Sequence, residues 1–195
     1  MTFWYDFAST YSYLSAMRVE ALASQQGLAL AWRPILLGPI FASQGWKTSP
    51  FNVYPAKGRY MVRDMERLAA ERGLAFHMPT PFPQNSLQAA RLAMALDDQA
   101  QRAAFTKAVY RAEFANRKPI DDADVLRACL FEAGTDAAAT LAAAQTDAVK
   151  LALRNETGEA QRLGIFGAPA FTTSDGELFW GDDRLDMAIG WAARG

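Results

Sequence analysis

The chain has 195 residues, of which 51% are hydrophobic and 21% charged, so a single domain with a full core is expected. Twenty basic against 21 acidic residues give a net charge of −1, which excludes the basic field that binding to nucleic acid or an anionic membrane requires. No stretch reaches the roughly 18 consecutive apolar residues of a membrane helix.

The chain contains one cysteine, Cys129, and one histidine, His77. A single cysteine excludes an internal disulfide, and Cys129 lies in a helical run where we expect a small buried apolar side chain. One histidine without neighbouring ligands argues against a metal site. One thiol and no secretory leader favour the reducing cytoplasm.

The first 34 residues predict a strand, a helix and a second strand. Residues 1–7 are aromatic and β-prone. Apolar side chains then recur at helical spacing up to Gly27, and Ser9 or Thr10 lies where an N-cap belongs. The run 28–34 ends at a proline and predicts a second strand, parallel to the first because a helix connects them.

The middle of the chain changes character twice. Residues 35–57 contain three prolines and two glycines and predict a long irregular connection. From 58 to 163 the periodicity is helical, including an Ala-rich stretch from 136 to 163, and Ser86 is a candidate N-cap.

The last 30 residues predict a hairpin and a helix. Residues 170–173 and 177–180 flank an Asp-Gly turn, which is a hairpin signal. Asp182 and Asp183 then open a final helix, since carboxylates suit a first helical turn. The predicted fold class is therefore α/β, with a small sheet covered by helices.

The order of these elements divides the chain. Residues 1–57 and 164–195 carry the predicted strands, whereas residues 58–163 form a large all-helical insertion between the second and third strands. We expect one integrated unit.

This order, with Pro169 just before the third strand, resembles the thioredoxin fold of DsbA-like proteins. In that fold the proline is usually cis and faces the start of the first helix, here the turn 9–12. Oxidoreductases of the fold carry Cys-x-x-Cys there, whereas this chain has Ser-x-x-Ser. Without sulfur at either end, thiol–disulfide exchange by the protein's own residues is excluded.

Five segments resemble, more narrowly, the family of 2-hydroxychromene-2-carboxylate isomerases and kappa-class glutathione transferases. They follow the family's order and span nearly the whole chain. They are residues 5–14 (YDFASTYSYL), 33–38 (RPILLG), 55–61 (PAKGRYM), 164–169 (GIFGAP) and 179–185 (FWGDDRL). The resemblance implies a thioredoxin-like fold, glutathione as cofactor, a small aromatic substrate and a homodimer.

The resemblance implies that Ser9 is the catalytic residue and that its hydroxyl stabilises the thiolate of bound glutathione. Lowering a thiol pKa from about 8.5 by about two units requires roughly 2.7 kcal/mol. A helix N-terminus supplies at most about 2 kcal/mol, and a hydrogen bond to a charged acceptor roughly 1.5–3 kcal/mol, so both together suffice. Thr10 and Tyr11 complete the turn, and most relatives have proline where Thr10 stands. The alternative is an ordinary N-cap without a ligand.

Further glutathione contacts follow from the same resemblance. The backbone of Ala168, beside Pro169, binds the cysteinyl part, and Asp182 and Asp183 lie where the family binds the γ-glutamyl ammonium. The alternatives are a plain loop proline and carboxylates that only cap a helix.

The segment that the resemblance assigns to substrate binding differs from the family's sequence pattern. Ala42 and Trp46 stand where relatives have a lysine and an asparagine. A substrate carboxylate would then need another cation to bind it, and the candidates are Lys47, Lys57 and Arg59. Lysine and arginine side chains are, however, mostly exposed to solvent at protein surfaces.

Asn52 and Asn85 are candidate replacement donors for the substrate, and Asn85 equally suits a helix start. Trp46 and Trp180 are candidate apolar walls for an aromatic ligand. Both also suit the core, and the core is the placement that we favour for them.

The function that the resemblance implies is a glutathione-dependent isomerase. It interconverts 2-hydroxychromene-2-carboxylate and trans-o-hydroxybenzylidenepyruvate by thiolate addition, bond rotation and elimination. The alternatives are a kappa-class-like transferase or peroxidase acting on another electrophile, and a non-catalytic ligand-binding module of the same fold.

Overall fold

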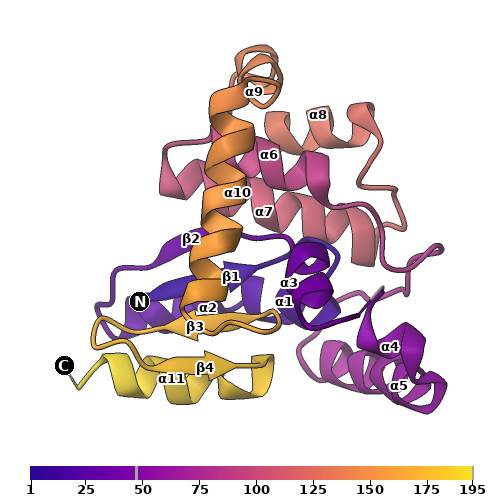
Figure 1. Ribbon diagram of the computed structural model, residues 1–195, viewed down its shortest axis with the longest axis vertical. Helices are drawn as coiled ribbons and strands as arrows, with labels where there is room; N and C mark the ends of the chain where they lie inside the picture. The colour runs from indigo at the N-terminus through magenta and orange to yellow at the C-terminus, as the bar shows by residue number, and fades with distance from the viewer. Residues whose placement is uncertain (47, 195) are drawn as a thin grey trace.

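The computed structural model describes residues 1–46 and 48–194, and it contains a small sheet with helices on both faces (Figure 1). The strands are β1 (Thr2–Tyr5), β2 (Ala31–Pro34), β3 (Ala170–Thr172) and β4 (Leu178–Trp180). They are ordered β2-β1-β3-β4. β1 and β2 are parallel, and β3 is antiparallel to both β1 and β4. The predicted parallel pair and the predicted hairpin are both confirmed.

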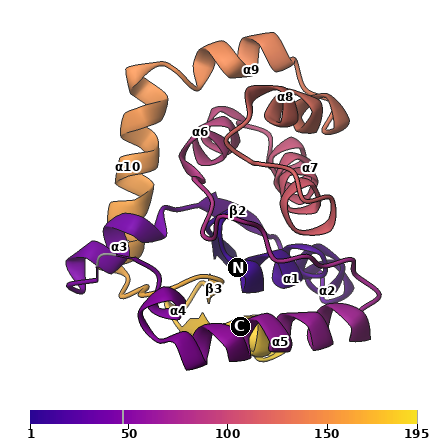
Figure 2. The ribbon, with the colours of Figure 1, turned by 90° about the vertical axis from the view of Figure 1, so that its right-hand side faces the viewer.

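Different helices pack against the two faces of the sheet (Figures 1 and 2). One face carries α1 (Thr10–Ala16), α2 (Val19–Gln25) and α11 (Leu185–Ala192), and the other α3 (Leu37–Ser43) and α10 (Asp147–Arg162). Side chains alternate along β1, so Phe3 and Tyr5 belong to the larger core, whereas Trp4 packs with Ile35 and Ala160 beneath α10.

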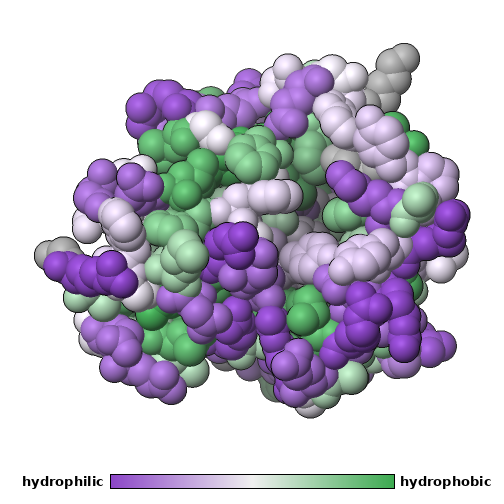
Figure 3. Space-filling view, turned by 90° about the horizontal axis from the view of Figure 1, so that it is seen from below, coloured by the Kyte–Doolittle hydropathy of each residue, from purple (hydrophilic) through white to green (hydrophobic). Residues whose placement is uncertain are grey.

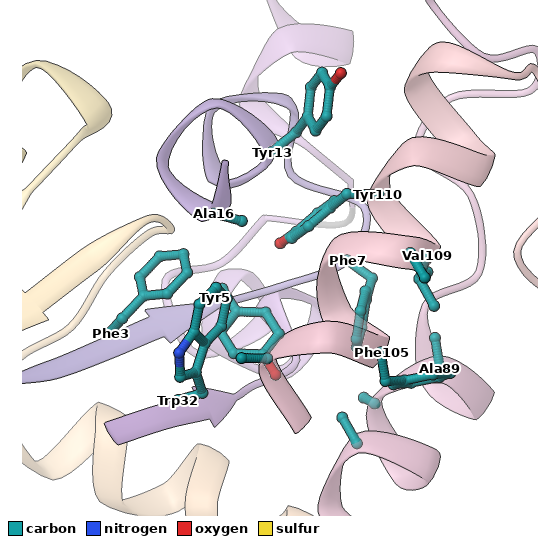
Figure 4. Close-up of a cluster of buried hydrophobic side chains, with 14 of the residues drawn as sticks. Phe3, Tyr5, Phe7, Tyr13, Ala16, Trp32, Ala89, Phe105, Val109 and Tyr110 are labelled. Carbon is teal, nitrogen blue, oxygen red and sulfur yellow. The ribbon is translucent and has the colours of Figure 1, made fainter. Parts of the chain in front are cut away.

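Aromatic rings form the centre of the larger core (Figure 4). Phe3 packs edge-on against Trp32 at 5.0 Å, and Tyr5 packs edge-on against Phe7 at 5.4 Å. The hydroxyl of Tyr5 hydrogen-bonds Thr106 at 2.8 Å, which satisfies a buried polar group. Each aromatic pair adds about 0.5–1.5 kcal/mol beyond the burial of its area.

The part of the predicted insertion that follows residue 86 packs on the β2 side of the sheet (Figure 2). It contains α6 (Leu87–Ala95), α7 (Gln99–Tyr110), a π-helical turn η1 (Arg111–Ala115), α8 (Ala123–Glu132) and α9 (Ala137–Ala143), followed by α10. Asp98, Asp122, Asp136 and Thr146 each accept a first-turn amide, so side-chain caps begin four of these helices. The larger core cluster draws residues from both the strands and the insertion.

The irregular connection predicted for residues 35–57 is wrong. This stretch forms α3, α4 (Pro50–Val53) and the beginning of α5 (Pro55–Glu71). The prolines begin helices here, because a proline in the first turn lacks only an N–H that has no intrahelical partner. Gly58 lets the two latter helices approach, since a Cβ there would lie 2.5 Å from the carbonyl oxygen of Phe51.

Two predicted helices are each divided. The helix expected up to Gly27 is interrupted at Met17 and Arg18, between α1 and α2, and the Ala-rich helix is interrupted at residues 144–146. The final helix begins with a 3₁₀ turn, η2 (Asp182–Arg184), before α11.

Seen from below, the face that carries α4, α5 and α11 mixes charged side chains with hydrophobic patches (Figure 3). Tyr60 of α5 and Met187 and Trp191 of α11 are exposed. A homodimer remains a prediction.

Candidate active site

Ser9 is the N-cap of α1 and links this helix to a loop far along the chain. Its Oγ accepts the N–H of Ser12 at 3.2 Å and donates to the carbonyl oxygen of Ala168 at 3.0 Å. Ser9 is half-buried, so the turn is not sealed from solvent. One hydroxyl therefore joins the start of the first helix to the loop before β3.

Asp6 holds the Ser9 turn in place. Its buried carboxylate accepts the N–H of Ala8 at 2.8 Å and of Leu37 at 2.7 Å. Its carbonyl oxygen accepts the N–H of Ser9 and the hydroxyl of Tyr110, each at 2.9 Å. Burial raises the pKa of Asp6, and the two amides oppose that rise. Sequence reasoning missed this residue, although a lone acid in an aromatic strand was a signal.

Thr10 and Tyr11 direct their side chains toward α5. The Thr10 hydroxyl donates to the sulfur of Met61 at 3.5 Å, and the Tyr11 hydroxyl donates to Asp64 Oδ2 at 2.9 Å. Burial and the Asp64 carboxylate raise the pKa of Tyr11, so its phenol stays protonated. The backbone N–H groups of Thr10 and Tyr11 make no hydrogen bond to residues 1–46 or 48–194. They are the groups that this turn offers to an anion.

The Ala168-Pro169 peptide bond is cis, as predicted, and its carbonyl oxygen faces Ser9. The carbonyl of Pro169 accepts the N–H of Gly181 at 2.9 Å, which ties this loop to the end of β4. The structure therefore brings together Ser9 and Ala168, residues that lie 159 positions apart.

Asp182 and Asp183 differ in their surroundings. The Asp182 carboxylate is buried and accepts the Ser15 hydroxyl at 2.9 Å and Arg72 Nη2 at 2.7 Å, with Arg18 Nε at 3.6 Å. Its oxygens are thus occupied by the protein. The Asp183 side chain is 73% exposed, so it is the member of the pair that is open to a ligand cation.

The loop before β3 and the end of β4 together present an exposed aromatic pair. Phe166 and Trp180 are 47% and 52% exposed, and their ring centroids lie 4.9 Å apart. The pair requires Gly167, because a Cβ there would lie 2.6 Å from Trp180 Nε1. The favoured core placement of Trp180 is wrong. Phe166 was missed as a site residue, although its place between two glycines beside Ala168 was a signal.

The other substrate candidates lie on the surface near α3, α4 and α6. Trp46 is half-buried and packs edge-on against Tyr54 at 5.9 Å. Asn52 Nδ2 donates to Thr48 at 3.1 Å, and Asn85 Oδ1 accepts the N–H of Leu87 at 3.1 Å. The side chain of Asn85 therefore caps the first amide of α6, and its Nδ2 remains as a side-chain donor.

Two of the candidate cations for a substrate carboxylate lie on α5. Lys57 and Arg59 are exposed on α5, and Lys57 lies over the ring of Tyr54 at 5.9 Å. Lys47 lies outside the described residues.

Comparison with known proteins decides the family. The model of the DsbA-like thioredoxin domain matches residues 1–189. The chain belongs to this family. It is 32% identical to a 2-hydroxychromene-2-carboxylate isomerase of Sphingobium xenophagum, over 95% of this chain and 93% of that protein. A solved 2-hydroxychromene-2-carboxylate isomerase superposes with a TM-score of 0.88 at 26% identity, covering 99% of this chain and 94% of the other.

Within the DsbA-like family the chain is therefore an enzyme of the 2-hydroxychromene-2-carboxylate isomerase group. A further relative is human glutathione S-transferase kappa 1, 26% identical over 94% of this chain and 86% of that protein. Among the described residues of this family member, no helix is long and apolar enough to cross a membrane, and no group of His, Cys, Asp and Glu has the arrangement of a metal site.

Proposed function

We propose that this enzyme is a glutathione-dependent isomerase that interconverts 2-hydroxychromene-2-carboxylate and trans-o-hydroxybenzylidenepyruvate. The observation that carries the proposal is the Ser9 hydroxyl, which caps α1 and lies 3.0 Å from the carbonyl oxygen of the cis Ala168-Pro169 peptide. It stands in a chain that is 32% identical to a named isomerase and that has no sulfur in this turn.

The residues present fit glutathione. The unpaired amides of Thr10 and Tyr11 suit a thiolate, the backbone of Ala168 suits the cysteinyl peptide group, and exposed Asp183 suits the γ-glutamyl ammonium. Bound glutathione would supply a thiolate that adds reversibly to a conjugated double bond, so that the bond rotates before the thiol leaves. The relationship to a kappa-class glutathione transferase supports this cofactor.

The hydroxyl of Ser9 exchanges partners in this proposal. Without a ligand, its hydrogen is donated to the Ala168 carbonyl. A ligand N–H that takes over this carbonyl releases the hydroxyl hydrogen toward the sulfur. The N–H of Ser12 continues to hold the Ser9 oxygen, so the hydroxyl turns without moving the residue. This hydrogen bond and the helix N-terminus together stabilise the thiolate.

Phe166 and Trp180 would hold the aromatic ring of the substrate. Both are exposed, Phe166 lies two residues before Ala168 in the chain, and their tilted rings would offer an apolar wall to the substrate. The wall orients the ring, which favours the productive approach of thiolate and acceptor.

A kappa-class-like transferase is the second candidate. Ala42 and Trp46 at the family's lysine and asparagine positions favour it, since they remove one anchor for a substrate carboxylate. The relatives named as isomerases argue against a non-catalytic module. Location in the cytoplasm remains a prediction.

The test adds glutathione and 2-hydroxychromene-2-carboxylate to the purified enzyme and follows both the substrate spectrum and free thiol. Isomerisation without loss of free thiol supports the isomerase. Stoichiometric loss of thiol supports the transferase, and an unchanged spectrum with no thiol loss contradicts both.

The Ser9→Ala variant is expected to lower turnover by about 10²–10³-fold, the usual cost of losing one aimed donor. It should also raise the pKa of the bound thiol, read from thiolate absorbance against pH. The control is Ser24→Ala, which changes an exposed serine on α2. An unchanged thiolate titration in Ser9→Ala would contradict the assigned role.

A further inference from the structure

A cleft lies between α5, the segment that joins α5 to α6 and the segment that joins η1 to α8. Its volume is about 610 Å³, within the range of small-molecule sites. It is lined by Glu66, residues 76–80, Gln84, Arg117 and Pro119. Neither Ser9 nor the loop before β3 belongs to this lining, so the cleft is separate from the site described above.

Three polar side chains of the lining present donors: Arg117 has no acceptor atom, and the acceptors of His77 and Gln84 are already used. Arg117 Nη2 lies 2.9 Å from His77 Nδ1. Since a guanidinium can only donate, Nδ1 is the acceptor and the other ring nitrogen, Nε2, carries the N–H. Gln84 Oε1 accepts the N–H of Ile120 at 2.8 Å, which leaves the amide NH₂ of Gln84 as a donor.

Arg117 has no acidic partner in the described part of the chain, where the ion pairs involve other residues. A lining that contains this guanidinium, an imidazole N–H and an amide NH₂ is suited to an anion.

The backbone of Arg117 is unusual. Its φ is 57°, in the left-handed region, and it is the only non-glycine residue with positive φ among residues 1–46 and 48–194. It ends the π-helical turn η1, where the N–H of Lys118 returns to the carbonyl of Ala112 at 2.8 Å. Glycine usually occupies such a helix end, so an arginine here is held in a conformation that disfavours it.

The rest of the lining limits which kinds of anion can bind in the cleft. Phe76, Met78, Pro79 and Pro119 supply apolar and aromatic surface. Glu66 also lines the cleft, and Arg63 pairs with it at 2.7 Å, which offsets its repulsion of an anion. A ligand with one carboxylate and a flat apolar body fits both kinds of surface.

We propose that the cleft formed by His77, Gln84 and Arg117 is a second binding site for a small aromatic carboxylate, held through the Arg117 guanidinium. Binding here is independent of the thiolate chemistry at Ser9.

The experiment titrates the ligand-free ¹⁵N-labelled protein with benzoate and with benzamide, its uncharged analogue. Benzoate is expected to give saturable amide shifts at the non-proline residues of 76–80 and 117–120, with an affinity at least tenfold higher than that of benzamide. Arg117→Gln should weaken benzoate at least tenfold. The matched control, Arg127→Gln, changes an arginine of similar exposure on α8 and should leave the affinity unchanged.

Arg117→Gly separates binding from folding. It should raise Tm by roughly 2–4 °C, because glycine adopts positive φ without strain, and yet weaken benzoate as strongly as Arg117→Gln. Equal affinity for benzoate and benzamide, shifts confined to other surfaces, or an unchanged affinity in Arg117→Gly would overturn the proposal. The same titration of Ser9→Ala should match the wild type; loss of benzoate binding in that variant would mean that the two sites are one.

Discussion

Two buried carboxyl groups, Asp6 and Glu113, differ in what satisfies them. Asp6 accepts two backbone amides, whereas neither oxygen of Glu113 has a hydrogen-bond partner among the described residues. Burial, and to a lesser extent the negative charge of Asp6, raises the pKa of Glu113 well above its ordinary value. Asp6 is therefore the group equipped to carry the charge, and a proton on Glu113 is favoured.

The raised pKa of Glu113 makes stability depend on pH. Because the folded pKa lies above the unfolded one, the contribution of Glu113 is complete below about pH 4.3 and is lost as pH rises through the folded value. We expect Glu113→Gln, which cannot ionise, to gain stability relative to the wild type between pH 5 and 8. Urea unfolding across this range measures the difference. The exposed control Glu71→Gln should show no such trend, and a constant difference for Glu113→Gln would refute the argument.

Cys129 is the small buried side chain that the sequence predicts, at 5% exposure. Burial, with a smaller effect of Glu132, raises the pKa of its thiol to about 11. Since only the thiolate reacts, alkylation of the native protein by iodoacetamide should be slow at pH 7 and rise about tenfold per pH unit toward that value. Mass spectrometry of the modified fraction checks this. Rapid modification at pH 7 would contradict the assignment of Cys129 as a buried, neutral thiol.

At the scale of elements, the strands and the hairpin could be predicted because their local signals agree with their burial. The aromatic run of β1 and the Asp-Gly turn between β3 and β4 are examples. Residues 35–57 were misread because a proline marks either a loop or the first turn of a helix, and local sequence does not distinguish them. The helix expected up to Gly27 failed for another reason, since no glycine or proline marks its interruption at Met17 and Arg18.

At the scale of the whole molecule, Asp182 joins segments distant in the chain. It contacts Ser15 of α1, Arg18 between α1 and α2, and Arg72 at the end of α5. The family resemblance implied the same role for the carboxylates of Asp182 and Asp183. Only the packed structure distinguishes them, because Asp182 is buried where Ser15, Arg18 and Arg72 meet, whereas Asp183 is exposed.

Removing this buried carboxylate should therefore destabilise the fold. Asp182→Ala leaves Arg72 without its acidic partner and removes one of the two carboxylates that face Arg18, so we expect a loss of about 3 kcal/mol in the free energy of unfolding. The neighbouring Asp183→Ala removes an exposed pair with Arg184 and should cost under about 1 kcal/mol. Urea denaturation measures both. Equal losses in the two variants would contradict the distinction between them.

The sequence by itself determined the parallel pair of β1 and β2, the hairpin of β3 and β4, and the absence of sulfur from the turn 9–12, because strand signals and residue types can be read locally. The pairing of that turn with Ala168-Pro169 came from the resemblance to the thioredoxin fold. Only the tertiary structure decided that Ser9 donates to Ala168, that Trp180 is exposed beside Phe166, and that the Asp182 carboxylate is already hydrogen-bonded within the protein. Hydrogen bonds and burial between residues more than 100 positions apart depend on packing, which no local pattern encodes.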